Sequence, residues 1–275
     1  MLKTMKIAAC IILYHPDLED LTRNILAIKD NIDHLILWKN SSEDISDLKV
    51  LSSLSCGLDI MGDGTNQYIS TPLNSCLEWC KFNGYDYLLT MDQDSEFESF
   101  GGFIDAIRAL PDDVSRDTII FAPNINNRYS CDQEVLSIES TITSGSLCNV
   151  DKSCKIGGFR EKYQIYWVDS EFCHRSHLNG YKILCLTRNN LKQQFGKKER
   201  RHGVDVYNYS KVTYFFIFRN MLWMHREYKS NPSIKTILYS SQMYLKSIIM
   251  GEKDKISKII SVTKGIYQGI TRKYK

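Results

Sequence analysis

The sequence lacks any hydrophobic run long enough to cross a membrane. Its longest apolar stretches cover residues 7–14 and 212–218, whereas a membrane-spanning helix needs about 20 apolar residues. The first nine residues lead into a strand-like segment without a signal-peptide cleavage site, so no secretory signal is expected. These absences predict a cytoplasmic protein that is either soluble or bound to a membrane surface.

Two common nucleotide-binding motifs are also missing. No G-x-G-x-x-G pattern follows the first apolar segment, and no G-x-x-x-x-G-K pattern occurs in the 275 residues. The first motif cradles the pyrophosphate of a dinucleotide, and the second cradles the phosphates of a nucleoside triphosphate. The sequence therefore argues against a dinucleotide-dependent oxidoreductase and against a P-loop NTPase.

The cysteines give no sign of a disulfide framework or a zinc centre. Nine is an odd number, and most of them lie within apolar segments, as buried free thiols do. Cys76 and Cys80 lie about one helical turn apart, but no further Cys or His follows at a spacing typical of zinc sites. We expect reduced thiols, which are usual in the cytoplasm.

The charge is divided unevenly along the chain. Residues 208–275 hold 13 Lys and Arg against 3 Asp and Glu, a net charge of +10, whereas residues 1–207 carry −7. A nucleic-acid-binding protein usually carries its basic patch on the folded reading surface, so no nucleic-acid partner is expected. The basic segment is also rich in aromatics, which favours an anionic membrane surface. A structural helical cap and a homodimer interface are the alternatives.

The first 125 residues alternate between strand-like and helical patterns. We expect strands at residues 6–14, 34–38, 58–61, 85–91 and 118–123, and helices at 17–28, 65–82 and 100–110. This alternation predicts a mainly parallel, Rossmann-like α/β sheet with helices on both faces.

The rest of the chain reads as a loop followed by helices. Residues 188–208 have the composition of a loop, and residues 197–202 hold five basic groups, among them Arg201. We expect this run either to close over a bound diphosphate or to be a solvated charged loop. Residues 208–275 predict three helical segments with breaks near 231–232 and 251. The expected domains are therefore a catalytic α/β domain, 1–207, and a helical extension, 208–275.

Two carboxylates stand at the end of the predicted fourth strand. Asp92 and Asp94 follow the apolar segment 85–91 at once. Residues i and i+2 of an extended chain point to the same side, so both carboxylates can bind one Mg²⁺ or Mn²⁺ together with a diphosphate. Ligands of open α/β sheets bind outside the carboxyl ends of the strands, where this pair is expected. A solvated acidic turn is the alternative.

Four segments resemble family 2 glycosyltransferases of the GT-A fold, especially their rhamnosyltransferase-like members. They are residues 13–17 (LYHPD), 66–74 (NQYISTPLN), 91–95 (MDQDS) and a block from 143 to 183 that contains GGF and WVDSEFCHR. The second segment is similar to the family pattern N-x-G-I-A-x-A-x-N, with Tyr68 in place of the glycine. The resemblance covers roughly residues 5–190 and implies a GT-A, nucleotide-sugar-binding fold.

The resemblance also implies a donor site and a metal site. The second predicted strand of this chain ends in Lys39-Asn40, where the family usually has an aspartate next to an asparagine. The resemblance implies Asp94 as the main metal ligand, with support from Asp92 and from Gln193, which stands where many members have a histidine. The metal is then held weakly, or His202 reaches in, or the site is degenerate. The implied donor-binding residues are Tyr14, His15, Asn40, Asn66, Asn74, Asp92, Ser144, Gly145 and Arg201.

The catalytic residues implied by the resemblance are Asp169 and Glu171. Asp169 is expected to remove the proton from the acceptor hydroxyl, as an inverting transferase requires, with its charge stabilised by the start of a helix. An N-cap role is the alternative for Asp169. Glu171 is expected to orient the base or the acceptor, and Arg175 to pair with a neighbouring acid.

The expected function is that of an inverting hexosyltransferase. It would move a sugar, such as L-rhamnose from dTDP-rhamnose, to a polysaccharide or a lipid-linked glycan at the inner face of the cell membrane. UDP-galactofuranose and UDP-hexoses remain alternative donors. Two alternatives of other classes are a catalytically impaired nucleotide-sugar-binding protein and a sugar nucleotidylyltransferase. The latter needs a Gly-rich basic loop after the first strand, which residues 14–18 lack.

Overall fold

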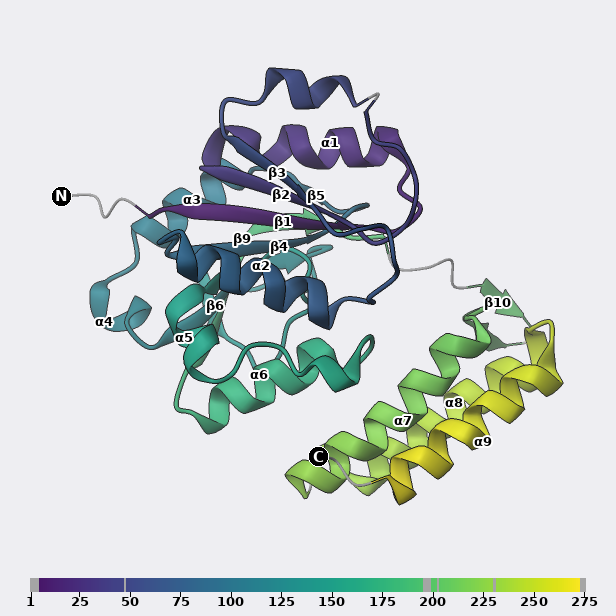
Figure 1. Ribbon diagram of the computed structural model, residues 1–275. Coiled ribbons are helices and arrows are strands. Elements are labelled where there is room, and N and C mark those ends of the chain that lie inside the picture. The colour runs from purple at the N-terminus through teal and green to yellow at the C-terminus, as the bar shows by residue number, and fades with distance from the viewer. Residues whose placement is uncertain (1–4, 47, 195–198, 202, 230, 273–275) are drawn as a thin grey trace. The chain divides into compact units, whose positions relative to one another are not determined.

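The protein divides into two compact units (Figure 1). The structure, a computed structural model, describes residues 5–46, 48–194, 199–201, 203–229 and 231–272. The first unit comprises Met1–Gln164 and Val168–Gln194, and the second comprises Ile165–Trp167 and Phe195–Lys275. Residues 195–207, which the sequence placed with the catalytic domain, thus group with the C-terminal helices.

The first unit is built on one sheet with strand order β3-β2-β1-β4-β8-β6-β9-β5, and β7 pairs with β9. Strands β3, β2, β1 and β4 are parallel, as the sequence predicts, whereas β8 runs antiparallel to β4 and β6. The strands are β1 (Ile7–Leu13), β2 (His34–Lys39), β3 (Gly57–Met61), β4 (Tyr87–Asp92), β5 (Glu96–Phe97), β6 (Thr118–Ile125), β7 (Val135–Ser137), β8 (Ser146–Asn149) and β9 (Lys182–Lys192).

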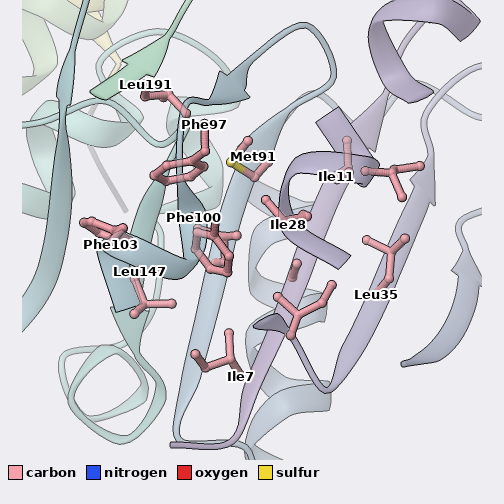
Figure 2. Close-up of a cluster of buried hydrophobic side chains, with 14 of the residues drawn as sticks. Ile7, Ile11, Ile28, Leu35, Met91, Phe97, Phe100, Phe103, Leu147 and Leu191 are labelled. Atoms are coloured by element: carbon pink, nitrogen blue, oxygen red, sulfur yellow. The ribbon is translucent and has the colours of Figure 1, made fainter. Parts of the chain in front are cut away.

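Helices cover both faces of this sheet because the side chains of β1 alternate between two apolar layers. Ile7 and Ile11 point to the layer of α1 and α3, which Figure 2 shows with Phe100 and Phe103. Cys10 points to the opposite layer with α2. The helices of the unit are α1 (Leu18–Ile28), α2 (Ser70–Phe82), α3 (Phe100–Arg108), α4 (Asp112–Ser115), α5 (Val150–Lys155) and α6 (Val168–Leu178), and the short 3-10 turns are η1 (Lys29–Asn31), η2 (Lys49–Ser53) and η3 (Glu161–Tyr163).

Two sequence expectations are wrong in detail. Helix α2 begins at Ser70 rather than at residue 65, because side-chain hydrogen bonds hold the segment 66–68 in a non-helical loop. The expected loop at 188–208 contains the end of β9 and two further strands, β10 (Glu199–Arg201) and β11 (Val204–Val206). The polar residues at the end of β9 form a strand because β6, which is distant in the sequence, supplies the partners for their backbone hydrogen bonds.

The second unit contains the three helices that the sequence predicts. They are α7 (Lys211–Tyr228), α8 (Ile234–Gly251) and α9 (Lys255–Thr271). Helix α9 packs closely on α7 because Gly265 lacks a side chain: a Cβ there would lie 2.5 Å from the Phe215 carbonyl oxygen. Within the described residues, no helix has the length and apolar character required of a membrane span.

A buried ion pair joins two of these helices. The Glu252 carboxylate accepts hydrogen bonds from Lys258 Nζ at 2.6 Å, from Ser247 Oγ at 2.5 Å and from the Tyr214 hydroxyl. Burial alone would raise the pKa of Glu252, but the hydrogen bonds from Lys258, Ser247 and Tyr214 outweigh it and lower the pKa. The charged form of Glu252 is therefore part of the folded state.

Candidate active site

The carboxyl ends of the parallel strands bring distant polar segments together. In the register of the sheet, Ile12 of β1 lies opposite both Trp38 of β2 and Asp92 of β4. The residues that follow these strands therefore meet at one edge of the sheet, which is the usual binding edge of open α/β folds. Tyr14, His15, Asn40 and the Asp92–Asp94 segment all belong to this edge.

The first carboxylate of the D-x-D segment is held through its backbone. The Asp92 amide donates to Ser144 Oγ at 3.0 Å, and Ser144 Oγ lies 2.7 Å from Ser95 Oγ. The Asn24 side chain of α1 donates to the Asp92 carbonyl at 2.6 Å. Ser144, Ser95 and Asn24 are all buried, so they fix the place of Asp92 without occupying its carboxylate.

Gly145 lets the strand β8 approach this segment. Its backbone has φ +78°, and its amide donates to the Thr90 carbonyl at 2.8 Å. A Cβ at this position would lie 2.8 Å from side-chain atoms of Leu191 and Pro123. Only glycine satisfies both the positive φ and this close packing.

The surroundings of Asp92 and Asp94 disfavour the charged forms of both carboxylates. Burial, followed by the neighbouring Asp94 charge, raises the pKa of Asp92 to about 6, although a 3.1 Å hydrogen bond from Gln193 Nε2 lowers it. Burial also raises the pKa of Asp94. The charge of Asp169 makes a smaller contribution to the raised pKa of Asp92. A cation between these carboxylates would relieve their repulsion.

Gln193 is held in a defined orientation beside Asp92. Its amide nitrogen donates to Asp92 Oδ2, and its amide oxygen accepts a hydrogen bond from Ser95 Oγ. Its backbone is fixed by Asn126, which donates to the Gln193 carbonyl at 2.9 Å and accepts from its amide at 3.0 Å. The structure thus brings Gln193 to the D-x-D segment, as expected, with its N–H rather than its oxygen directed at Asp92.

Tyr14 and His15 form an exposed aromatic pair at the end of β1. Their ring centroids are 4.4 Å apart, and the Tyr14 side chain is about half exposed. The Gln93 amide accepts from the Tyr14 N–H at 2.8 Å and donates to the Tyr14 carbonyl at 3.0 Å. The His15 amide donates to Ser41 Oγ at 2.9 Å, and its ring contacts Glu43. The Tyr14 ring is therefore open to a ligand while its backbone is fixed, whereas the exposed His15 ring is held on one side by Glu43.

Asn40 and Asn66 shape the loop before α2. Asn40 Nδ2 donates to the Tyr68 carbonyl at 2.7 Å, and Asn40 Oδ1 accepts from the Gln67 amide at 2.7 Å. Asn66 Oδ1 accepts from the Tyr68 amide at 2.8 Å. Tyr68 has φ +59°, a conformation that favours glycine, which explains why the resembling motif has a glycine at this position. Asn40 and Asn66 therefore position the loop with groups that a ligand would otherwise contact.

Asn74 of α2 clamps the G-G-F segment. Its Nδ2 donates to the Phe159 carbonyl at 2.7 Å and to Glu161 at 3.2 Å, and its Oδ1 accepts from the Phe159 amide at 2.7 Å. A Cβ on Gly158, which has φ +61°, would lie 2.5 Å from Asn74 Oδ1. The glycine and the asparagine thus fit each other, and the Asn74 amide is fully used by the chain.

Glu171 is a buried member of an ion-pair network. Arg175 donates to both of its carboxylate oxygens, at 2.7 and 2.8 Å, and Arg160 Nε lies 3.1 Å from Glu171 Oε1. Arg175 also donates to the Ile156 and Gly158 carbonyls at 2.5 and 2.7 Å. The expected pairing of Arg175 with an acid is confirmed. Glu171 contributes by holding this network, since its carboxylate is taken up by arginines.

Asp169 is the second residue of α6 and lines a small cavity. The cavity has a volume of about 10 Å³ and is also lined by Thr90 and Thr143. Burial raises the pKa of Asp169, while Oδ1 accepts a 2.7 Å hydrogen bond from the Ser170 amide. The preceding Tyr166 and Trp167 have φ +60° and +64°. Such strain in non-glycine residues is concentrated at functional sites, where the surrounding fold maintains it.

Comparison with known proteins identifies the fold. No protein-family model matches the sequence, and no curated protein matches it. Similar solved structures include GalNAc-T7 with UDP, GalNAc and Mn2+ (TM-score 0.61, 11% identity, 82% of this chain and 49% of that one). The 1–349 fragment of S. aureus TarS has a TM-score of 0.57 at 13% identity, covering 97% of this chain and 81% of that one. The same fragment with UDP has a TM-score of 0.52 at 12% identity, covering 98% and 72%.

The chain has the GT-A fold. It spans about half the length of GalNAc-T7, and at these identities the likeness concerns the fold alone.

The D-x-D segment of this GT-A sheet fits a hard divalent cation. Among the described residues, the Asp94 carboxylate makes no hydrogen bond or ion pair with another residue, and the Asp92 carboxylate accepts a hydrogen bond from Gln193 alone. Within the described residues, no cluster of three or more His, Cys, Asp or Glu side chains forms a metal centre. An octahedral ion would therefore depend on further oxygen donors, such as an amide, a diphosphate or water.

Arg201 belongs to the second unit, whereas the other expected site residues belong to the first. It lies in β10 and donates to Glu199 at 2.5 and 2.9 Å and to the Gly251 carbonyl at 3.3 Å. Lys197, Lys198 and His202 of the same basic run lie outside the described residues.

Several supporting residues of the site were not found by sequence reasoning. Gln93 fixes Tyr14, Ser95 holds Gln193, and Asn126 and Asn24 fix the backbones of Gln193 and Asp92. A signal existed for Asn24, which is a polar residue on the apolar face of α1. Ser95 directly follows the D-x-D, but nothing in the sequence links Asn126 to position 193.

Proposed function

We propose that the chain is a metal-dependent, inverting glycosyltransferase that uses a nucleotide-sugar donor. The observation that carries the proposal is the Asp92–Asp94 pair at the carboxyl edge of a GT-A sheet. The UDP and Mn2+ in the GalNAc-T7 structure, and the UDP in a TarS structure, support a nucleotide-sugar donor and a divalent cation for this chain.

The donor is proposed to be a dTDP- or UDP-sugar, with dTDP-L-rhamnose as the first candidate and UDP-hexoses or UDP-galactofuranose as alternatives. The exposed rings of Tyr14 and His15 would contact the base and ribose. Ser144 and Gly145 contribute by holding the D-x-D segment at the diphosphate. Asn40, Asn66 and Asn74 contribute indirectly, through the loops that they position. The role of Arg201 as a donor contact stays a prediction.

The cation, Mg²⁺ or Mn²⁺, would be held by Asp94 with support from Asp92 and the Gln193 amide oxygen. When bound, it neutralises charge on the nucleoside diphosphate as that group leaves. An amide oxygen is a weaker ligand than imidazole for transition metals, and Ser95 competes for it here. We therefore expect weak metal binding that depends on the diphosphate.

Asp169 is proposed as the general base. Its carboxylate would remove the proton from the acceptor hydroxyl while the hydroxyl oxygen attacks the anomeric carbon on the face opposite the leaving diphosphate. A raised pKa makes the carboxylate a stronger proton acceptor, and the start of α6 stabilises the charged form before the reaction. Glu171 is proposed to position this helix through Arg175 and Arg160.

The acceptor is proposed to be a polysaccharide or a lipid-linked glycan, and the enzyme to act in the cytoplasm at the inner face of the cell membrane. This location follows from the proposed acceptor and from the basic helical unit. A panel of nucleotide-sugar donors identifies the sugar that is transferred.

The test is calorimetry of UDP and dTDP binding with Mn²⁺ or EDTA, combined with assays of donor hydrolysis and transfer. Asp94→Asn should abolish the metal dependence of nucleotide binding. Asp169→Asn should keep binding but lower turnover by about 100-fold or more, the usual contribution of a general base. Asp105→Asn, at an exposed position of α3, is the matched control and should change neither. Equal nucleotide affinity with Mn²⁺ and EDTA would contradict the metal role.

A catalytically impaired nucleotide-sugar-binding protein is the second candidate. It is favoured by Gln193, whose amide is already used by Asp92 and Ser95. This candidate predicts metal-dependent nucleotide binding without hydrolysis or transfer of any donor in the panel. A nucleotidylyltransferase would instead release pyrophosphate from a nucleoside triphosphate and a sugar phosphate.

A further inference from the structure

The outward face of α9 is apolar, although nothing in the described residues covers it. Ile256, Ile260, Tyr267 and Ile270 are all exposed, with exposed fractions between 48% and 77%. Their spacings of four, seven and three residues place them in one stripe along the helix. The opposite side of α9 packs on α7 through Gly265 and Gly269, so the exposed stripe is not the core side of the helix.

Helix α8 carries a second stripe of the same kind. Ile234, Leu238 and Ile249 are 63%, 65% and 56% exposed and lie at helical spacing. Lys235 and Lys246 are exposed beside this stripe. The core of the unit lies on the other side of α8, at Ser247 and Ile248, which are fully buried.

Several of the aromatic residues that first suggested a membrane surface lie in the core rather than on this face, although Tyr239 and Tyr267 are exposed. Tyr214, Phe218 and Trp223 of α7 are buried in the core of the second unit or close to it. The exposed apolar side chains are mostly aliphatic and belong to α8 and α9. Sequence composition alone could not make this distinction, because both sets recur at helical spacing.

The apolar stripes are flanked by positive charge. In residues 234–272 the exposed acidic side chain is Asp254, because Glu252 is buried against Lys258. Among the described residues, none of the exposed basic side chains of this segment forms an ion pair with a carboxylate. They are Lys235, Lys246, Lys253, Lys255, Lys264 and Arg272.

We propose that α8 and α9 form a docking face for an anionic lipid bilayer. The face consists of the exposed aliphatic and Tyr267 side chains of both helices and the basic side chains beside them. Aliphatic side chains would enter the boundary between headgroups and acyl chains, and lysines would contact lipid phosphates. A second copy of the chain fits less well, since a two-fold interface would place the same unpaired lysines against each other.

This face deepens the proposed function because it would bring the enzyme to a lipid-linked acceptor, but its test does not depend on activity. The full chain is sedimented with vesicles of phosphatidylcholine alone or with 30% phosphatidylglycerol (on the order of that found in anionic membranes), without donor or metal. Binding should require the anionic lipid and decrease with added salt.

Two variants separate the apolar and the charged contributions. Ile260→Ser combined with Tyr267→Ser should lower vesicle affinity at least tenfold, because two apolar side chains are no longer buried in the bilayer. Lys246→Gln combined with Lys264→Gln should lower affinity about fivefold per lysine and reduce the salt dependence. All four positions are exposed, so circular dichroism should show unchanged helix content and melting.

The matched controls lie on the first unit. Phe82→Ser removes a 90% exposed aromatic at the end of α2, and Lys155→Gln removes an exposed lysine of α5. Neither should change vesicle binding. Equal loss in the controls, absence of binding to anionic vesicles at low salt, or a dimer in sedimentation velocity that Ile260→Ser disrupts would each overturn the docking face. Donor hydrolysis in solution does not require vesicle binding, so measuring it in parallel tests the proposed function separately from the docking face.

Discussion

Replacing Asn74 by alanine tests whether this side chain supports the fold or contacts the donor. Asn74 makes two 2.7 Å hydrogen bonds to the N–H and C=O of Phe159, which is 3% exposed, and a 3.2 Å bond to Glu161. Truncation leaves both backbone groups buried without a partner, and each such group costs about 1–3 kcal/mol. Because relaxation recovers part of this cost, we expect Asn74→Ala to lower the free energy of unfolding by about 2–4 kcal/mol.

Urea unfolding followed by circular dichroism measures this change. Asn83→Ala is the matched control, because Asn83 is exposed and makes one side-chain hydrogen bond, to the Trp79 carbonyl, so its loss should cost less than about 1 kcal/mol. Nucleotide affinity of folded Asn74→Ala should stay close to that of the unaltered protein. Unchanged stability together with lost nucleotide affinity would refute the structural role and establish Asn74 as a donor contact.

Two further predictions concern buried groups. Glu252→Gln should destabilise the protein by about 3 kcal/mol at pH 7, because Lys258 keeps a buried charge without its partner. The pKa of Glu252 is lowered in the folded state, so its contribution is present above the unfolded value near 4.5 and is lost as the pH falls through the folded pKa. Unfolding measured at several pH values should thus show the difference shrinking below pH 4.5; a constant difference would contradict it. Gly145→Ala should lower stability by about 1–3 kcal/mol, since a Cβ would meet Leu191 at 2.8 Å on a backbone with φ +78°. An unchanged melting temperature would show that the strand can shift at no cost.

The sheet and its carboxyl edge could be predicted from the sequence because they depend on local patterns. Continuous apolar runs such as residues 7–13 are typical of strands buried on both faces, and β1 has that environment. The D-x-D directly follows such a run, so its place at the binding edge follows from chain direction alone. The breaks near 231–232 and 251 likewise predicted where two of the three helices, α7 and α8, end.

The roles of the asparagines were decided by tertiary structure. Asn40, Asn66 and Asn74 match positions of a donor-binding motif, and their amides can bind either a ligand or a backbone. In the fold, Asn40 and Asn66 hold Tyr68 in a left-handed conformation, and Asn74 bonds to Phe159, 85 residues away. Sequence spacing carries no information about such partners, because they are brought together only by the tertiary fold.

In the second unit, too, the sequence predicts the helices, whereas the tertiary structure decides which of their faces are buried. Apolar periodicity by itself determined that residues 208–275 form helices, since each helix needs an apolar side to pack. It could not determine which apolar side is covered, because α9 has one face of glycines against α7 and another of exposed isoleucines. Glycine permits the closest approach of two backbones, so the less hydrophobic face became the core, and only the three-dimensional packing could decide it.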